Sequence, residues 1–139
     1  MTRKPRSSLG FTLVELLVVV AIISVLAAIS YPSYRNHVIK GHRASAQAFL
    51  MDAAQRQHQY FLDNRAFAPD LGTLFGTASN DLAVPSEVSP YYTTPVVTTT
   101  SGPPPTFLIT AAPKGAQAAN NEPELKIDQA GVKQPATAW

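Results

Sequence analysis

Residues 11–29 read FTLVELLVVVAIISVLAAI, and this stretch decides the fold. Only Thr12, Glu15 and Ser24 are not apolar, and Glu15 is the only charged residue. As an α-helix the stretch is about 28 Å long, which is close to the thickness of the hydrocarbon core of a bilayer. A helix buried in a soluble domain needs a large domain around it, and the rest of this proline-rich chain is too short to supply one. The stretch therefore predicts a membrane-spanning helix.

A cleavable secretory signal is the main alternative for such a segment. Its cleavage site would follow the apolar run and would have small residues in an A-x-A pattern. Here the run is followed by SYPSY at residues 30–34, which contains two bulky tyrosines. The helical pattern also continues beyond this point, so we expect the segment to stay attached to the domain that follows.

Residues 33–64 continue the helix with one apolar face. Side chains recur at the i, i+3, i+4, i+7 spacing of such a face, namely Ala46, Phe49, Leu50, Ala53, Gln57 and either Tyr60 or Phe61. Pro32 has no amide hydrogen for the carbonyl of Ala28, so the sequence predicts a kink or local melting there. We expect one helix of roughly 50 residues that ends near Asp63 and Asn64.

The second half of the chain predicts a small antiparallel sheet. Residues 66–90 are interrupted by prolines and glycines, which indicates an irregular connector with a short helical turn at 71–75. Strands are expected at residues 91–100, 106–112 and 125–128, the second with Phe107, Ile109 and Ala111 on one face. The expected fold class is α+β, with a long N-terminal helix packed against three or four antiparallel strands.

Charge is unevenly distributed along the chain. The first ten residues carry Arg3, Lys4 and Arg6 with no acid, whereas residues 33–65 hold five basic side chains against two acidic ones. Residues 66–139 reverse this, with three lysines against six carboxylates. This negative balance argues against a nucleic-acid partner. The chain has no cysteine, which excludes a disulfide, a cysteine-ligated metal and a thiol nucleophile.

Other candidate sites are weakly supported by the sequence. His37, His42 and His58 are not spaced to place two metal ligands on one helix face, and packing or surface roles are favoured. Several side chains with oxygen atoms follow one another near the last strand without the regular spacing of a calcium loop: Asn120, Asn121, Glu122, Glu124 and Asp128. No catalytic triad or phosphate loop stands out, so we expect no enzyme activity, no cofactor and no metal.

The most informative pattern lies where the basic leader meets the apolar run. Gly10 has no side chain, so a peptidase at the membrane surface can bind the extended backbone there. A cut after Gly10 would leave Phe11 with an α-ammonium group, which could compensate Glu15 where an unpaired charge costs a few kcal/mol. Thr12-x-x-Glu15 also fits a capping box at the helix start. The two roles of Glu15 are compatible, and both remain open.

The leader, Gly10, the FTLVE motif of residues 11–15, the apolar helix and Pro32 resemble the class III signal of type IV prepilins and pseudopilins. The resemblance covers about residues 3–34. It implies that prepilin peptidase cleaves between Gly10 and Phe11 and methylates the Phe11 amine. It also implies that Glu15 pairs with the amine of a neighbouring subunit, that the apolar helices pack in the filament core, and that the helix melts around Pro32.

The rest of the chain is similar to minor pilins of the PilE type, in residues 43–57, 64–67, 107–117 and 125–131. Many such chains close a C-terminal loop with a disulfide, which this chain cannot form because it ends Ala138-Trp139 and has no cysteine. The resemblance implies a structural subunit of a type IV pilus, a minor one that acts in pilus assembly. A secretion pseudopilin and a pilin specialised for ligand or DNA binding are the alternatives.

The same resemblance implies a pilin-like α+β fold in which the first half of the long helix is transmembrane. It also sets the expected domains, partners and location. We expect a cleaved leader at residues 1–10, a transmembrane and assembly helix at 11–32, and a periplasmic or extracellular domain at 33–139. Within that domain the helix occupies residues 33–64, the connector 66–90 and the sheet 91–139. The expected partners are other pilin subunits, prepilin peptidase and the inner-membrane assembly machinery. The precursor would cross the inner membrane once, and the mature subunit would enter an extracellular pilus or a periplasmic filament.

Overall fold

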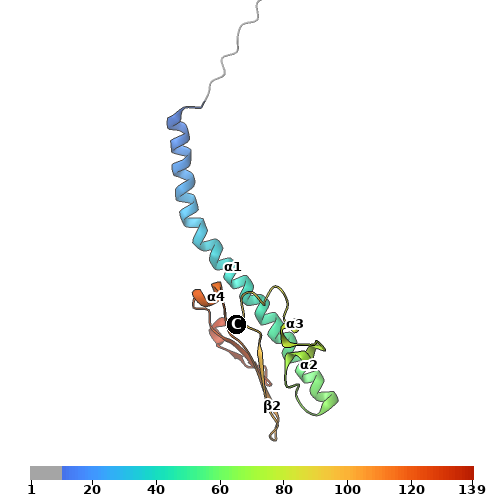
Figure 1. The fold of residues 1–139 in the computed structure, drawn as a ribbon. Helices are drawn as coiled ribbons and strands as arrows, with labels where there is room; N and C mark the ends of the chain where they lie inside the picture. Colours follow the sequence, from blue (N-terminus) through green and yellow to red (C-terminus); the bar gives the residue numbers. More distant parts are fainter. Residues whose placement is uncertain (1–10) are drawn as a thin grey trace, which may run out of the picture. The chain divides into compact units, whose positions relative to one another are not determined.

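The computed structural model describes residues 11–139. The chain divides into two units, Met1–His37 and Val38–Trp139. We call residues 11–37 the anchor and Val38–Trp139 the head. One helix, α1 (Leu13–Asn64), contributes residues to both units (Figure 1).

Helix α1 confirms the predicted long helix. It contains 52 residues and ends at Asn64, as the sequence indicated. Within the head it buries one face, and every position predicted for that face from Ala46 to Gln57 is buried, with Ala54 in addition. Pro32 lies inside α1, and the residues on both sides of it are helical. The kink expected at Pro32 remains a prediction.

The connector after α1 begins with a residue in the left-handed region. Arg65 has a φ of 58°, and its amide donates to the carbonyl of Phe61 at 2.8 Å, which ends the helix. Helix α2 (Leu71–Phe75) confirms the predicted turn, and the carboxylate of Asp70 caps it by accepting from the amide of Thr73 at 2.7 Å. A second short helix, α3 (Asn80–Ala83), was not predicted.

Four antiparallel strands form a meander in the order β1-β2-β3-β4. They are β1 (Val96–Thr100), β2 (Thr106–Ala111), β3 (Leu125–Asp128) and β4 (Lys133–Gln134). The predicted antiparallel sheet is confirmed, β3 at the predicted bounds and β2 one residue shorter. A short helix, α4 (Ala116–Ala119), lies between β2 and β3, and a 3-10 turn, η1 (Ala136–Ala138), precedes the C-terminus.

The strand expected at residues 91–100 is wrong in its first half. β1 begins only at Val96. The amides of Tyr91 and Tyr92 both donate to the carbonyl of Val88 at 3.0 Å, so the preceding turn holds this backbone. Pro95 then has no amide hydrogen to offer a neighbouring strand. Tyr92 is fully buried and makes only an isolated bridge to Pro113.

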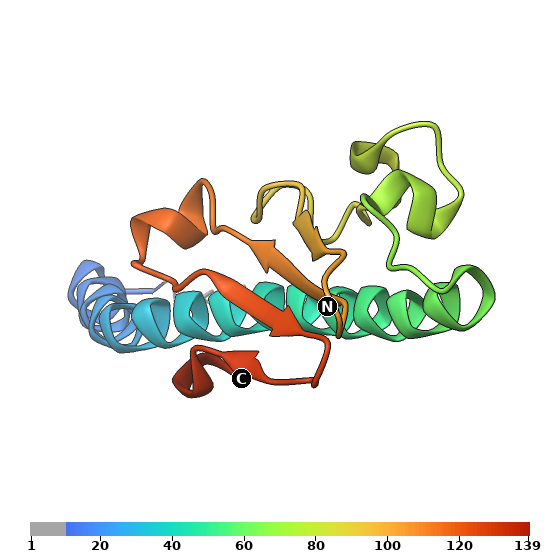
Figure 2. The same ribbon diagram turned by 90° about the horizontal axis from the view of Figure 1, so that it is seen from below.

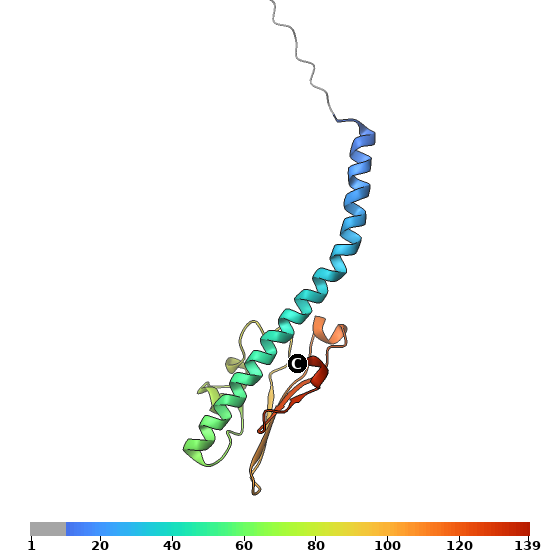
Figure 3. The same ribbon diagram turned by 180° about the vertical axis from the view of Figure 1, so that it is seen from behind.

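The core of the head lies between α1 and the inner face of the sheet. In Figure 2, β2 and β3 lie alongside α1. In Figure 3, α4 lies beside the part of α1 that comes first in the head, and the connector with α2 and α3 lies beside a later part of the helix. Alternation along the strands points one set of side chains at the helix. The largest fully buried side chains include Leu50, Leu71, Tyr92, Phe107, Ile109 and Leu125. Burial of each such apolar side chain stabilises the head by roughly 1.5–3 kcal/mol before entropy is counted.

Candidate functional site

From Leu13 to Ile29 the surface of the anchor is apolar on all sides. The large apolar side chains from Leu13 to Ile29 are each between 47% and 79% exposed, although water is a poor solvent for them. Within the part of the chain that the structure describes, α1 is the one helix long and apolar enough to cross a membrane. Such a surface requires apolar surroundings, which a bilayer or other apolar helices supply.

Glu15, the only charge in this surface, takes part in the predicted capping box. The amide of Glu15 donates to the hydroxyl of Thr12 at 3.2 Å. The amide and hydroxyl of Thr12 donate in turn to Oε2 of Glu15, at 3.5 Å and 3.4 Å. These bonds are at the long end of the usual range and are exposed. The carboxylate therefore supports the helix start through weak contacts that leave it free to accept a stronger donor.

The predicted cleavage point lies only partly within the described residues. Gly10 lies outside them, and Phe11 precedes α1 with 82% of its surface exposed. The predicted pair joins Glu15 of one subunit to the Phe11 amine of another. The processing site, the methylation of Phe11 and the charge pair therefore remain predictions.

A nearly buried ion pair in the head links two distant parts of the chain. Arg43 on α1 donates from Nε to Oε2 of Glu122 at 2.5 Å and from Nη2 to Oε1 at 2.6 Å. These hydrogen bonds raise the pKa of Arg43 above its ordinary value. Burial raises the pKa of the nearby Tyr92 to about 12, and the charge of Glu122 adds to this effect. The two partners are 79 residues apart, so no local sequence pattern predicted the pair.

A buried amide fastens the connector to α1. Gln57 is fully buried, and its side chain donates to the carbonyl of Ala68 and accepts from the amide of Ala68, both at 2.8 Å. The sequence predicted Gln57 on the buried face of the helix but gave no reason for a polar residue there. The two bonds to Ala68 are that reason, because a buried amide is stable only when it is paired.

The basic side chains of the head fall into two groups. Three have a carboxylate partner within 4 Å: Arg43 with Glu122, Arg56 with Asp52, and Lys126 with Glu124. Among the described residues of the head, the other four have no such partner, namely Lys40, Arg65, Lys114 and Lys133. These four cations are the ones available to an external anion.

Arg65 is the unpaired cation that lines a hollow. The hollow has a volume of about 280 Å³ and lies between the end of α1 and the turn that joins β1 to β2. Arg65 and Phe67 line it from one side, and Thr100, Ser101 and the turn at residues 102–105 line it from the other. A guanidinium, two hydroxyl groups and an aromatic ring thus surround one opening, and no carboxylate is among its lining residues.

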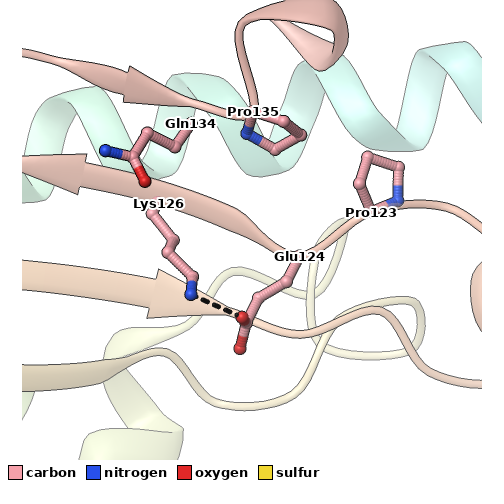
Figure 4. Close-up of a pocket in the computed structure, with 5 residues that line it drawn as sticks. All are labelled: Pro123, Glu124, Lys126, Gln134 and Pro135. Atoms are coloured by element: carbon pink, nitrogen blue, oxygen red, sulfur yellow. Dashed lines mark ion pairs between the residues drawn. The ribbon is translucent and has the colours of Figure 1, made fainter.

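A second hollow lies at the other edge of the sheet, beside β3 and β4. Its volume is about 310 Å³. Figure 4 shows the residues that line it: Pro123, Glu124, Lys126, Gln134 and Pro135. The ammonium of Lys126 and the carboxylate of Glu124 are 2.9 Å apart in this hollow. Their charges compensate each other, so this hollow requires no ligand to balance its charge.

Three of the five side chains considered for calcium are directed to separate partners. Glu122 binds Arg43, Glu124 binds Lys126, and Oδ1 of Asp128 accepts from the amides of Ala130 and Val132 at 2.9 Å.

Two of the three histidines pack against aromatic rings. His42 stacks on Tyr91 with the ring centroids 3.4 Å apart, and His58 meets Phe67 and Phe107 edge-on.

Comparison with known proteins agrees with this geometry. Residues 32–122 match the family model described as type IV minor pilin ComP, DNA uptake sequence receptor. Residues 5–31 match the prokaryotic N-terminal methylation motif. Among solved structures, a type IV pilin from Shewanella oneidensis superposes with a TM-score of 0.54 at 25% identity, over 73% of this chain and 97% of that one.

Curated relatives match between half and about 60% of the chain. The type IV wide pilus major component PilA4 of Thermus thermophilus is 36% identical over 69 residues, which is 50% of this chain and 53% of the relative. The type IV major pilin protein PilE1 of Neisseria gonorrhoeae is 32% identical over 85 residues, which is 60% of this chain and 47% of the relative. The chain thus spans about half the length of these relatives. The match over residues 32–122 covers well over half of the chain, and the chain therefore belongs to the family of type IV minor pilins.

Proposed function

We propose that this chain is a structural subunit of a type IV pilus and that it acts as a minor subunit in pilus assembly. The observation that carries the proposal is the stretch of the anchor from Leu13 to Ile29, whose large side chains are apolar on all faces and exposed, with Glu15 as its single charge. A bilayer surrounds such a helix in the precursor, and the helices of other subunits surround it in a filament. A secretion pseudopilin would use the same anchor in a periplasmic filament.

Processing creates the group that Glu15 needs. Cleavage between Gly10 and Phe11 by prepilin peptidase frees the amine of Phe11, and methylation leaves it positively charged. In the low dielectric of packed apolar helices an unpaired carboxylate is costly, so an ammonium from a neighbouring subunit stabilises it. The long capping bonds to Thr12 are weak enough to be supplemented or replaced by this contact.

Two substitutions separate the assembly role of Glu15 from its capping role. Glu15→Gln removes the charge but keeps the shape and the capping geometry. Thr12→Val keeps the charge but removes the hydroxyl that caps the helix. We expect Glu15→Gln to leave the membrane-bound pool normal and to reduce incorporation into filaments at least tenfold, whereas Thr12→Val reduces it less than twofold.

The measurement is an immunoblot of sheared filaments and of membranes from the same cells. Equal incorporation of the Glu15→Gln variant and the parent would refute the charge pair. Equal losses in both variants would assign Glu15 to the helix start alone.

We propose DNA binding by the head as a second candidate function. The matching family model is described as a DNA uptake sequence receptor, which supports this candidate. The negative charge balance of residues 66–139 counts against it. The local arrangement also supports it. Arg65, with Thr100 and Ser101 across the hollow, offers a cation and hydroxyl donors suited to a phosphate group, and Phe67 offers an aromatic edge.

Arg65→Gln tests this candidate, with Arg56→Gln as the matched control, because Arg56 is also exposed but already has Asp52 as a partner. The measurement is fluorescence anisotropy of labelled duplexes, selected from a random library, with the full chain in detergent micelles. Loss of one phosphate contact should lower the affinity for DNA about fivefold at 0.15 M salt. It should also make the slope of log affinity against log salt concentration less steep by about one. Unchanged binding by Arg65→Gln, or an equal loss in Arg56→Gln, would contradict a phosphate site at this hollow.

A further inference from the structure

The segment between β2 and β3 leaves the sheet and returns to it. It spans residues 112–124 and contains α4, and we call it the strap. It begins beside Tyr91, whose carbonyl accepts from the amide of Lys114 at 2.8 Å. It turns back at Asn121, which has a φ of 55°, and Leu125 then re-enters the sheet opposite Ala111.

The strap has almost no apolar contact with the rest of the head. From Lys114 to Asn121 every residue except Gln117 is exposed, including the three alanines of α4. Beyond Asn121, Glu122 is the side chain that packs most closely, with 9% of it exposed. Burial of apolar surface therefore does not hold the strap in place, unlike the strands on either side of it.

Two polar side chains fasten the strap to α1. Gln117 donates from Nε2 to the carbonyl of Ile39 at 3.0 Å. Glu122 accepts both hydrogen bonds from Arg43, at 2.5 Å and 2.6 Å. Ile39 and Arg43 are four residues apart on the helix, so both points of attachment lie on one face of α1. We call these two attachments the latch.

The latch can open at lower cost than an apolar contact of the same size. When the strap leaves, the carboxylate and the guanidinium enter water together, and water replaces each of their hydrogen bonds. Removal of one partner is different, because it leaves the other charge nearly buried and unpaired. Tyr92 lies beneath the strap, and both Tyr92 and Gln117 of the strap are fully buried. Water can reach the polar atoms of both side chains when the strap lifts.

We propose that residues 115–124 of the strap undock from α1 as a unit, with the Arg43–Glu122 pair as the controlling contact, while the four-stranded sheet stays folded and residues 112–114 stay bonded to residues 91–93. Undocking uncovers Tyr92 and the turn of α1 from Ile39 to Arg43. The head then has two states, strap docked and strap free, that differ in the surface offered to a neighbouring molecule. This device is separate from the anchor and from the hollow at Arg65.

Limited trypsin digestion of the full chain in detergent micelles tests the proposal. Lys114 lies in the strap, and Lys126 lies in β3, so cleavage after each reports on the strap and on the sheet separately. Glu122→Gln should raise the rate of cleavage after Lys114 at least tenfold and leave cleavage after Lys126 unchanged. The control is Glu124→Gln, which breaks the more exposed pair with Lys126 and should change the rate after Lys114 less than twofold.

A charge exchange and a salt series complete the test. The double variant Arg43→Glu with Glu122→Arg should restore most of the protection of Lys114. The parent should keep most of its protection in 1 M salt, since salt screens a pair that is 9–23% exposed far less than a surface pair. An unchanged rate after Lys114 in Glu122→Gln would overturn the proposal. Faster cleavage after both lysines would also overturn it, because the pair would then support the whole head.

Discussion

The anchor and the head use the same helix in opposite ways. In the anchor, α1 is apolar on every side from Leu13 to Ile29, and its large side chains there are about half exposed or more. In the head, α1 buries one face, from Ala46 to Gln57, under the sheet and the connector. The difference follows from the spacing of apolar residues in the sequence. A helix that is apolar on all sides packs against groups outside its own chain, whereas a helix with one apolar face packs against the rest of its own domain. The anchor is therefore the part of the chain built for association.

The polar groups of the anchor and the head also differ in how well they are bonded within the chain. Glu15 makes long bonds to Thr12, at 3.2–3.5 Å, and has no basic partner among the described residues. In the head, Glu122 and Gln57 have close partners, at 2.5–2.8 Å, within the same chain. A charge that is satisfied internally stabilises the fold, whereas a charge left with weak partners is available for assembly.

The largest expected effect on stability comes from Leu50, which is fully buried in the core. Leu50→Ala should lower the free energy of unfolding of the head by about 4 kcal/mol, because it leaves a cavity between α1 and the sheet. Urea unfolding followed by the fluorescence of Trp139, the only tryptophan, measures this in detergent micelles. The matched control is Leu17→Ala in the anchor, where the side chain is 61% exposed and the change in head stability should be near zero. A similar loss in both variants would contradict the separation of the two regions.

A smaller effect is expected from the buried amide. Gln57→Ala should cost about 3 kcal/mol, since it leaves the amide and the carbonyl of Ala68 buried without partners. Gln55→Ala, two residues away on the exposed side of α1, should cost less than about 0.5 kcal/mol. The same urea titration compares the two variants. Equal stability of Gln57→Ala and the parent would mean that water reaches Ala68.

The smallest of these effects concerns pH. The pKa of Tyr92 is about 12 in the folded head and 10.0 without the fold, so from pH 10 to 12 the unfolded chain releases its proton first. The stabilising contribution is complete below pH 10 and is lost as the pH rises to 12, by about 2 kcal/mol. The measurement is the free energy of unfolding from urea titrations between pH 10 and 12. Tyr92→Phe should remove this part of its decrease with rising pH. Parallel pH curves for the parent and the variant would show that Tyr92 is not protected by burial.

Much of the fold was predictable from local patterns. The end of α1 at Asn64, helix α2 and strand β3 followed from apolar spacing and from glycine and proline positions. The short helices α3 and α4 were missed because four residues carry too little periodicity. The early part of the first strand was overpredicted because Tyr91 and Tyr92 favour strands, whereas the turn at Val88 and the missing amide hydrogen of Pro95 decide the backbone there.

The functional features were predictable only where they are local. Gly10, Phe11, Thr12 and Glu15 are near neighbours in the sequence, so their chemistry could be read directly, and the structure shows the capping box. The Arg43–Glu122 pair could not be predicted, because its partners are brought together by the folded sheet. The hollow at Arg65 likewise depends on the end of α1 meeting the turn between β1 and β2. A charge balance summed over residues 66–139 does not include Arg65 and cannot show which cations lack partners.

The most direct test of the central claim is mass spectrometry of the N-terminus of this chain in sheared filaments. Processing at the junction of leader and anchor predicts a chain that begins at Phe11 and carries one methyl group on its α-amine. That group is the positive charge that Glu15 is proposed to bind in the neighbouring subunit. An intact terminus at Met1 or Thr2, or a chain that begins at Tyr31 after cleavage behind Ser30, would contradict the account.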